Sequence, residues 1–339
     1  MDIFHERAGV ELPRPVFSST LPPPPPQAAA LVAVEEGLPS KLRVVVFNVG
    51  LLRVKVPFVG TVFSNPPCVD QRFPFLAGAL NASGADVLCL QEIYEEVHVK
   101  ALVAQTCNVY PYCARVDSGF AFQKHNGLMY LSKFPIECTH LSFHEKAANL
   151  EVFFGSKACL ACVVVHPTFG RIAMVNMHTT AGGLEHPEKV DQIREAELKE
   201  AIDLCEEYVK KDLCDEAMIV GDLNCGPEAS SVNYGFMIEN LWSDAVQAAW
   251  GERSPIPPTW DSRNLLNVGG VHAMCPSQRV DHVFQRKGSK LKPESACLMF
   301  TEKIVEVLFP AGWLWGKAKP PVHHSLSDHS GVMVTFGKR

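Results

Sequence analysis

Polar residues with metal-binding or proton-transfer chemistry adjoin several short apolar runs of this chain. Loops at the ends of buried strands can hold ligands on a rigid scaffold. The candidates are Asn48 after LRVVVF, Glu92 after DVLCL, His178 after IAMVNM, Asp222 and Asn224 after AMIVG, Asp281 within RVDHVF, and Asp328 and His329 before GVMVTF. Carboxylate and amide oxygens are hard ligands that suit Mg²⁺, and a histidine moves protons near neutral pH. Each residue alone has an ordinary structural use, in a turn for example, so the prediction of a metal-assisted hydrolase depends on the whole set.

Other classes of enzyme lack their motifs in this sequence. No H-E-x-x-H zinc pair is present, and His323 and His324 are adjacent instead of sharing one helical face. There is no G-x-S-x-G turn for a serine nucleophile, and no Walker or G-x-G-x-x-G loop. These absences disfavour zinc protease, esterase, kinase and dinucleotide-binding functions.

The elements that must position the candidates are strands and a few helices. Apolar runs rich in β-branched residues predict buried strands at LRVVVF, DVLCL, GLMYL, CLACVVV, IAMVNM, AMIVG, RVDHVF, ACLMF and GVMVTF. The clearest helix is predicted over about 186–211, where Val190, Ile193, Ala201, Leu204 and Tyr208 form an apolar stripe. Weaker helical patterns cover about 70–82, 94–107 and 228–240. This distribution predicts an α/β fold with helix-covered sheets.

The chain divides into a proline-rich tail and one large domain. Residues 1–38 include the run Pro22–Pro26, a composition that opposes a packed core, so we expect a flexible tail there. No low-complexity linker interrupts residues 39–339, which predicts a single catalytic domain. The longest stretch without a predicted element is about 246–279, and we expect it to border the site because such long loops are usually functional.

Composition and charge narrow the class of protein. The 339 residues are 47% hydrophobic and 20% charged, which allows a sizeable core. A formal net charge of -6 disfavours a broad basic face for nucleic acid. No apolar stretch approaches the ~20 residues that span a bilayer, and a signal-peptide pattern is missing. We therefore expect a cytoplasmic protein whose contact with membranes, where it occurs, is peripheral.

The twelve cysteines are scattered, and several lie in apolar runs (Cys89, Cys159, Cys162 and Cys297), which predicts reduced core thiols. Cys159 and Cys162 form a C-x-x-C, but a spacing of three along a strand places the two side chains on opposite faces. A shared metal or redox site is therefore not expected.

Taken in chain order, the motifs resemble those of the endonuclease/exonuclease/phosphatase superfamily over about residues 42–337. They are FNVG at Asn48, LQEIYEE at Glu92, NGLMYLSKFPI from Asn126, HTTAGG from His178, GDLNCGP from Gly221, RVDHVF at Asp281 and LSDHSGVMV at His329. The order and spacing of LQE, GDLN and SDH are the specific part. The resemblance implies a four-layer α/β/β/α sandwich, in which two packed mixed β-sheets are flanked by helices, and a metal-dependent phosphoric ester hydrolase.

Within the superfamily, the chain is similar to the neutral sphingomyelinase branch. The similar segments are HTTAGG, FFGSKACLACVVV, and TWDSRNLLN followed by SQRVDHVF. One departure is Lys157-Ala158, where the branch usually has Lys-Gly. The resemblance implies hydrolysis of sphingomyelin to ceramide and phosphocholine with Mg²⁺, or Mn²⁺ in its place.

The resemblance also implies a role for each candidate. Glu92 would be the principal metal ligand, with Asn48 and Asp328 in the same metal environment. His329 would be the general base, and Asp281 would hold its imidazole in the productive tautomer.

The remaining residues would act on the nucleophile and the phosphate. Asp222 and Asn224 would position the attacking water and a phosphate oxygen, or share a second metal. A protonated His178 would stabilise developing negative charge, and Lys157 would contact the phosphate. Direct attack by water predicts inversion at phosphorus without a covalent intermediate.

The class of substrate remains open at this point. The segment IVEVLFPAGWLWG at 304–316 suits either insertion into a bilayer interface, which would make a phospholipid the partner, or a core strand and a packed loop. A nuclease, or a nucleotide or inositol phosphatase, on the same fold would want a basic groove. The basic candidates are spread out: Lys124, Lys133, Arg263, Arg279 and Arg286. A non-catalytic scaffold is disfavoured because the whole candidate set is present.

Overall fold

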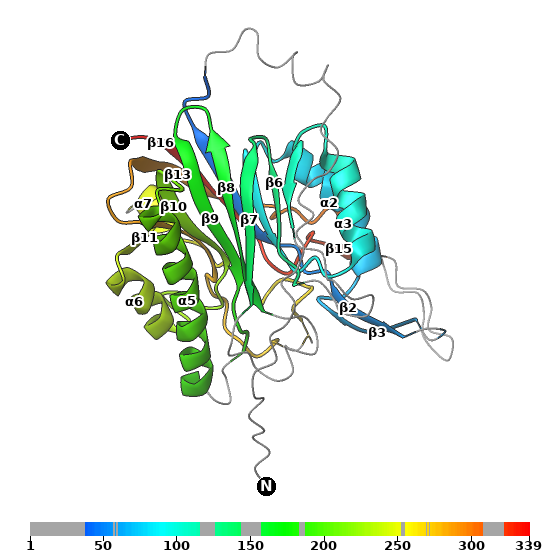
Figure 1. The fold of residues 1–339 in the computed structure, drawn as a ribbon. Coiled ribbons are helices and arrows are strands. Elements are labelled where there is room, and N and C mark those ends of the chain that lie inside the picture. Colours follow the sequence, from blue (N-terminus) through cyan, green and yellow to red (C-terminus); the bar gives the residue numbers. More distant parts are fainter. Residues whose placement is uncertain are drawn as a thin grey trace, which may run out of the picture.

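The computed structural model describes residues 38–56, 58, 60–115, 126–143, 157–182, 187–251, 255–268, 270, 272–307 and 322–339. Two six-stranded sheets pack face to face, and helices cover the outer face of each (Figure 1). This is the expected four-layer α/β/β/α sandwich in a single domain. The tail predicted over residues 1–38 falls outside the described residues, apart from Leu38.

The first sheet places the ends of two parallel strands at one edge. Its order is β13-β16-β1-β4-β6-β5. The strands are β1 (Leu42–Asn48), β4 (Val87–Gln91), β5 (Tyr112–Ala114), β6 (Met129–Ser132), β13 (Leu291–Met299) and β16 (Gly331–Lys338). β1 and β4 are parallel, and their register pairs Asn48 with Gln91. Asn48 therefore lies beside the loop that carries Glu92.

The second sheet brings three candidate residues into register. Its order is β11-β12-β10-β9-β8-β7. The strands are β7 (Ile136–Phe143), β8 (Ala158–His166), β9 (Gly170–His178), β10 (Glu216–Asp222), β11 (Trp242–Asp244) and β12 (Asp281–Arg286). Asp222 pairs with His178 of parallel β9 on one side and with Asp281 of antiparallel β12 on the other. The backbone alone thus places these residues side by side.

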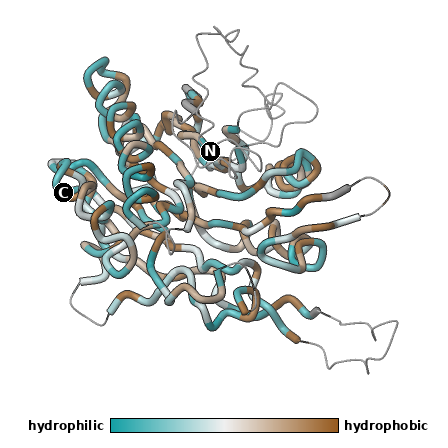
Figure 2. The backbone as a smooth tube through the Cα atoms, turned by 90° about the horizontal axis from the view of Figure 1, so that it is seen from below, coloured by the Kyte–Doolittle hydropathy of each residue, from teal (hydrophilic) through white to brown (hydrophobic). Residues whose placement is uncertain are grey.

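Alternating side chains of the strands fill three apolar layers. Val44 and Val46 of β1 face the second sheet, while Val45 and Phe47 face the helices over the first sheet. The helices are α2 (Val69–Ala82) and α3 (Glu96–Thr106) on the first sheet, α5 (Pro187–Lys210) and α6 (Ser231–Glu239) on the second, and the short α7 (Ala245–Trp250). Figure 2, from the lower end of Figure 1, shows hydrophobic strands in the interior and a hydrophilic outer face on α5.

The strands and helices predicted from the sequence are present, and seven strands in the described part of the chain were not predicted. A hairpin of β2 (Leu52–Val56) and β3 (Gly60–Asn65) projects from the lower end of the molecule (Figure 1). A second antiparallel pair joins β14 (Val305–Val307) to β15 (Val322–His324). The other unpredicted strands are β5, β7 and β11, and the short helix α7 was also missed.

The segment 304–316 and the cysteines agree with the sequence predictions only in part. Val305 of the segment 304–316 is buried in the core, whereas residues 308–316 lie outside the described residues. Cys159 and Cys162 belong to different core layers, as predicted. The cysteines that the structure describes as free include Cys297, which is exposed on edge strand β13, so its predicted burial is wrong. In the described part of the chain, no helix combines the length and apolar character needed to cross a membrane.

Candidate active site

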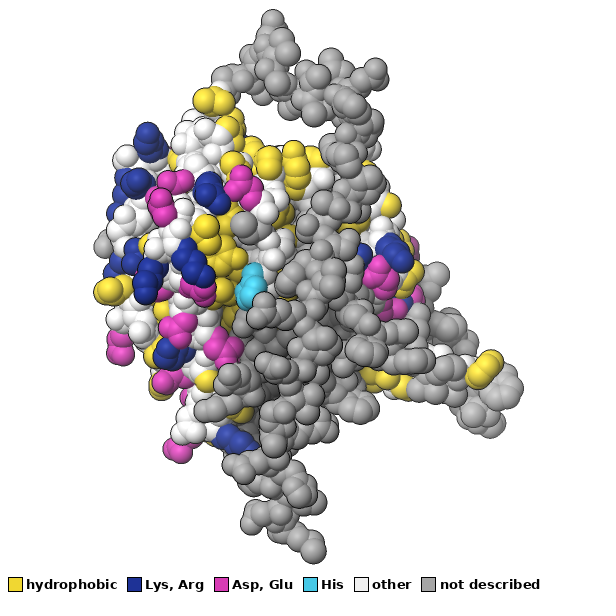
Figure 3. Space-filling view, in the orientation of Figure 1, with side chains coloured by type: hydrophobic (Ala, Val, Ile, Leu, Met, Phe, Trp, Pro, Cys, Tyr) yellow, Lys and Arg dark blue, Asp and Glu magenta, His cyan; other side chains and the backbone are white. Residues whose placement is uncertain are grey.

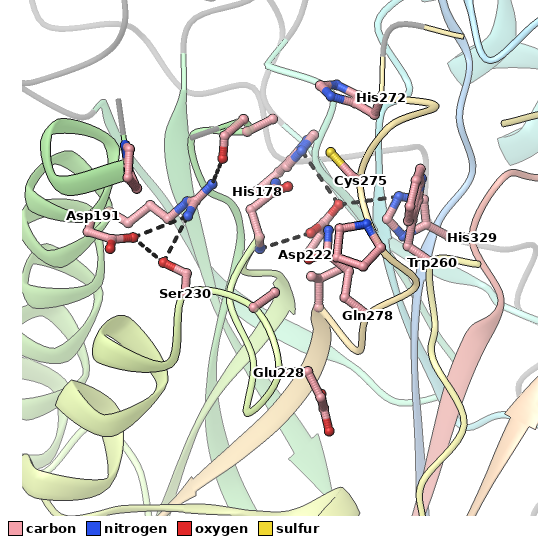
Figure 4. A pocket seen from close by; sticks show the side chains of 18 of the residues that line it. His178, Asp191, Asp222, Glu228, Ser230, Trp260, His272, Cys275, Gln278 and His329 are labelled. Atoms are coloured by element: carbon pink, nitrogen blue, oxygen red, sulfur yellow. Dashed lines mark hydrogen bonds and ion pairs between the residues drawn. The ribbon is translucent and has the colours of Figure 1, made fainter. Parts of the chain in front are cut away.

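A cavity of 370 Å³ opens at the edge where β1, β4, β9 and β10 end. Predicted residues in its wall are Glu92, His178, Asp222, Asn224, Asp328 and His329. Asn48 and Asp281 lie directly behind the wall, hydrogen-bonded to Glu92 and His329 respectively. The structure therefore brings together the residues that the sequence singled out. Figure 4 shows His178 and His329 approaching Asp222 from opposite sides.

Asp222 is the shared neighbour of the two histidines. Its Oδ2 lies 3.6 Å from Nε2 of His178 and 3.7 Å from Nε2 of His329. Its Oδ1 accepts the backbone N–H of Asn224 at 3.0 Å. The preceding Gly221 has φ 138°, and a Cβ there would lie 1.9 Å from the carbonyl oxygen of Met177. Glycine is thus needed for β10 to deliver Asp222 this close to β9.

Asn48 links the two sheets at the site. Its Nδ2 donates to Oε1 of Glu92 at 3.1 Å and to Oδ2 of Asp222 at 3.0 Å. Its Oδ1 accepts the backbone N–H of Gly50 at 3.0 Å. The amide nitrogen, not the oxygen, therefore faces the carboxylates, so Asn48 holds these two acids apart and oriented. Asn48 thus lies beside Glu92, while its oxygen points to the backbone, and its place in a metal site stays a prediction.

Glu92 has the environment of a cation ligand. It occupies the left-handed region with φ 64°, a costly conformation for a non-glycine residue. Burial and the negative charge of Asp328 raise the pKa of Glu92 to about 7, against the opposing hydrogen bond from Asn48. Its Oε2 is buried and accepts no hydrogen bond within the described part of the chain. A divalent cation would satisfy this oxygen and the crowded charge, so the residues fit Mg²⁺.

A second group of possible ligand atoms is less suited to a cation. Atoms of Asp222, Asp281 and His329 all lie within 4.8 Å of one another. However, Nδ1 of His329 and Oδ2 of Asp281 already form a hydrogen bond of 2.8 Å. We therefore place the candidate cation site at Glu92 and Asp328.

The His329–Asp281 pair is buried and strongly charged. Burial opposes a positive charge on His329, but the carboxylates of Asp281, Asp222 and Asp328 outweigh it and raise the pKa of His329 well above its usual value. Asp281 is fully buried and holds Nδ1. Nε2 is the ring nitrogen that faces Asp222.

His178 differs from its prediction as a charged group. Burial and the neighbouring Lys157 ammonium lower the pKa of His178 to about 3, although Asp222 acts in the opposite direction. The prediction of a protonated His178 is contradicted in this arrangement, because burial and the positive charges of Lys157 and His329 disfavour a charge on His178 and only Asp222 favours it. His178 is neutral here.

Lys157 and Asn224 meet at one backbone carbonyl. The oxygen of Thr179 accepts Nζ of Lys157 at 2.9 Å and Nδ2 of Asn224 at 3.1 Å. Lys157 is buried, and the described lining of the cavity does not include it. Its predicted contact with phosphate stays a prediction, whereas Asn224 is in the wall itself.

The long segment over 246–279 borders the site, as predicted. Trp260, His272, Cys275 and Gln278 line the cavity, and Figure 4 shows Trp260 beside His329. Trp260 also bridges to the backbones of Gln278 and His329. The segment thus forms one wall and supports the general-base candidate.

Sequence reasoning missed several buried residues that hold the site loops. Arg72 of α2 donates to the carbonyl oxygens of Val49 at 3.2 Å and Leu326 at 2.6 Å, and so joins the loops of Asn48 and Asp328. On α5, Glu197 accepts both the backbone N–H and the hydroxyl of Thr180 at 2.8 Å. No motif marks these side chains, because polar residues on a helix ordinarily face solvent.

Arg194 supports the other side of the cavity. It donates to the carbonyl oxygens of Thr180 at 2.7 Å and Gly182 at 2.6 Å, and to Oγ of Ser230 at 3.0 Å. Figure 4 shows Ser230 and Asp191 on this side, across from the histidines. The guanidinium thus fixes the HTTAGG loop against α5 and α6.

Comparisons with known proteins agree with this fold. The family model described as Endonuclease/Exonuclease/phosphatase matches residues 47–329, and comparison with curated proteins gave no match. Sphingomyelinase C from Streptomyces griseocarneus is 19% identical with a TM-score of 0.67, covering 88% of this chain and 99% of that one. TDP2 from C. elegans is 17% identical with a TM-score of 0.61, covering 92% and 79%. A mutant beta toxin from Staphylococcus aureus with bound magnesium ions is 18% identical with a TM-score of 0.65, covering 88% and 100%.

At these identities the solved structures share the fold, while the family match spans most of the sequence. Members of that family are phosphoric ester hydrolases. The chain belongs to the Endonuclease/Exonuclease/phosphatase family.

Proposed function

We propose that this protein is a Mg²⁺-dependent phosphodiesterase that hydrolyses sphingomyelin to ceramide and phosphocholine. The observation that carries the proposal is one cavity whose wall presents Glu92, Asp222 and His329, with Asp281 hydrogen-bonded to His329 behind the wall. Glu92 and Asp328 would hold the cation, for which Mn²⁺ can substitute, with Asn48 orienting Glu92.

The chain's own residues would prepare water for attack on phosphorus. Asp281 fixes Nδ1 of His329, which leaves Nε2 to accept the proton of the water. Asp222 and Asn224 would position that water and a phosphate oxygen, and neutral His178 would donate a hydrogen bond to the phosphate. A Mg²⁺ ion at Glu92 would polarise a phosphoryl oxygen and offset the negative charge that keeps His329 protonated.

The charge of the cavity supports a phosphocholine headgroup over a nucleic acid. Besides the acids already named, Asp191 and Glu228 line it. Its arginine, Arg194, is engaged by backbone carbonyls and Ser230. An acidic lining repels a polyanionic backbone, whereas it suits a single phosphodiester that carries a quaternary ammonium.

The basic residues that a nuclease would need are engaged elsewhere. Arg279 pairs with Asp244 in the interior. The other described candidates form ion pairs away from the cavity lining: Lys133 with Asp86, Arg263 with Asp261, and Arg286 with Glu206. Lys124 lies outside the described residues.

The test is a parallel assay with Mg²⁺ on sphingomyelin vesicles, lysophospholipid, phosphoinositides and abasic DNA, using the wild type and Glu92→Gln. We expect phosphocholine release from sphingomyelin that depends on Glu92 and stops in EDTA. Cleavage of DNA or release of inorganic phosphate from phosphoinositides, without phosphocholine, would contradict the proposal.

We also propose that residues 39–339 form the catalytic domain and that 1–38 act as a flexible tail. As part of the proposed function, we also propose that the segment 304–316 makes peripheral contact with the membrane. A variant that begins at Leu38 is expected to keep the wild-type kcat on a soluble phosphodiester. Loss of folding or of turnover in that variant would make the tail part of the domain.

A further inference from the structure

The β2–β3 hairpin ends in exposed apolar side chains. Phe58 lies between the two strands and is fully exposed, with a relative solvent-accessible surface of 110%, and Val62 of β3 is 53% exposed. Phe58 also has φ 64°, a conformation that glycine or asparagine adopts at lower cost in such a turn. Figure 3 shows hydrophobic side chains along the projection on the right, where Figure 1 places β2 and β3. A two-stranded hairpin is only marginally stable in water, so this one suits contact with another surface.

The base of the hairpin is fixed to the site loops. Arg72 donates to the carbonyl oxygens of Gly50, which precedes β2, and of Pro66, which follows β3. The same guanidinium reaches Leu326, two residues before Asp328. Arg53 of β2 is held by Glu95, with a bond of 3.0 Å, and by Asp70. The hairpin therefore has a set orientation relative to the catalytic residues.

The mouth of the cavity lies on the same side and carries further exposed apolar residues. Asn65, the last residue of β3, lines the cavity. Val232, also in the lining, is 64% exposed, and Met274, between the lining residues His272 and Cys275, is 88% exposed. We call Phe58, Val62, Val232 and Met274 the docking face. Exposed apolar residues concentrated around a cavity are typical of a contact site for lipid or protein.

Charge selects the kind of surface that this face fits. The protein has a formal net charge of -6. Arg53 of β2 is neutralised by two acids, and Lys55 is the further basic residue of β2 and β3, which is fewer than the cluster of about four to eight basic residues that attracts anionic lipid. A zwitterionic bilayer accepts apolar side chains at its interface without needing such a cluster.

We infer that the docking face binds a zwitterionic lipid surface and presents the cavity to headgroups in that surface. The choice of lipid rests on the proposed function, but the contact itself does not depend on catalysis. Phe58 and Val62 insert at the interface, and the Arg72 anchor keeps the mouth of the cavity facing it.

Vesicle flotation of the full chain in EDTA tests the contact in the absence of turnover. The probes are phosphatidylcholine vesicles with and without sphingomyelin, and vesicles that contain phosphatidylserine. Phe58→Ser/Val62→Ser is expected to weaken binding to both zwitterionic types by roughly tenfold or more. Leu38→Ser is the matched control, because Leu38 is 71% exposed and precedes the start of β1, whereas the cavity opens where β1 ends.

Turnover on soluble bis(p-nitrophenyl) phosphate separates docking from chemistry, and the double variant is expected to match the wild type there. Unchanged vesicle binding in the double variant would overturn the inference. So would stronger binding to phosphatidylserine vesicles, or an assembly of the wild type in solution that dissociates in the double variant. Wild-type binding to vesicles without cleavage of sphingomyelin would leave docking in place and refute the proposed substrate.

Discussion

The hydroxyl of Ser327 donates a hydrogen bond of 2.7 Å to the backbone carbonyl oxygen of Asn48, which lies 279 residues away in the chain. The same hydroxyl is 3.1 Å from Oδ1 of Asp328. One buried side chain thus ties the end of β1 to the loop that carries both Asp328 and His329. The position of the candidate cation site relative to the general-base candidate depends on this bond.

Ser327→Ala should therefore impair catalysis more than its effect on folding suggests. We expect a loss of about 1–2 kcal/mol in unfolding free energy, because a buried carbonyl loses its donor. Turnover should fall roughly ten- to hundredfold, since small displacements of catalytic groups are costly. Urea unfolding and kcat measured together check this, with the exposed Ser295→Ala as control. Equal kcat in both variants would show that the bond does not position the site.

Sequence patterns predicted which residues meet at the cavity because these residues adjoin apolar runs, and the pairing of the strands then brings them together. His178, Asp222 and Asp281 each end or begin an apolar run, and pairing of β9, β10 and β12 places them in one row. The charge on His178 was not predictable in this way. It depends on burial and on Lys157, which directly precedes a different strand, β8.

The burial of Arg72 and the β2–β3 hairpin could not be predicted from the sequence. Arg72 has the sequence context of a solvent-facing helix residue, and its burial follows from carbonyl groups that converge only after folding. The run LLRVKVPFVGTVF lacks an Asn-Gly or Asp-Gly turn, so nothing local divides it into two strands.

Compared with the wild type, Glu92→Gln should be more stable without Mg²⁺ and should gain less stability when Mg²⁺ is added. The pKa of Glu92 is raised from 4.5 to about 7, so the folded protein binds this proton more tightly than the unfolded chain. Wild-type stability should fall as pH rises from 4.5 to about 7. Near pH 8 the metal-free variant should be more stable by about 3–4 kcal/mol, at roughly 1.4 kcal/mol per pKa unit.

Added Mg²⁺ should raise the melting temperature of the wild type and leave Glu92→Gln almost unchanged, because binding to the folded state alone stabilises it. Thermal unfolding in EDTA and in a MgCl2 series measures both effects. Glu302→Gln, at an exposed position, should behave as wild type. Equal Mg²⁺ stabilisation of the wild type and Glu92→Gln would place the cation elsewhere.

His329→Ala should lower kcat by about 10²–10⁴-fold, the range for loss of a positioned general base. Asp281→Asn should also lower kcat, because Asp281 holds Nδ1 of His329 at 2.8 Å. The double variant should be no slower than His329→Ala, since the two residues act as a unit. Steady-state kinetics at saturating Mg²⁺ test this, with the exposed His323→Ala as control. Additive losses in the double variant would separate the two roles.

Asp244 stabilises the wall behind the site through a buried charge. Its Oδ2 accepts Nη1 of Arg279 at 2.6 Å, and the same Nη1 lies 3.1 Å from Nδ1 of His282. Nε2 of His282 lies 2.8 Å from the carbonyl oxygen of Cys225, in the loop after Asp222. Burial opposes the charge of Asp244, but His282 and Arg279 hold its pKa well below the usual range. The loop after Asp222 therefore depends on this network.

Asp244→Asn should cost about 3–5 kcal/mol at pH 7, because it leaves Arg279 buried beside a neutral partner. The depressed pKa means that the carboxylate's contribution is fully present above the unfolded pKa of about 3.9 and is lost as pH falls below it. The difference between wild type and variant should consequently shrink in urea titrations run from pH 5 towards pH 2. Asp203→Asn, which removes an exposed ion pair with Lys199, should cost less than about 1 kcal/mol. A gap between wild type and Asp244→Asn that stays constant across this pH range would mean that packing, not the charge, holds the wall.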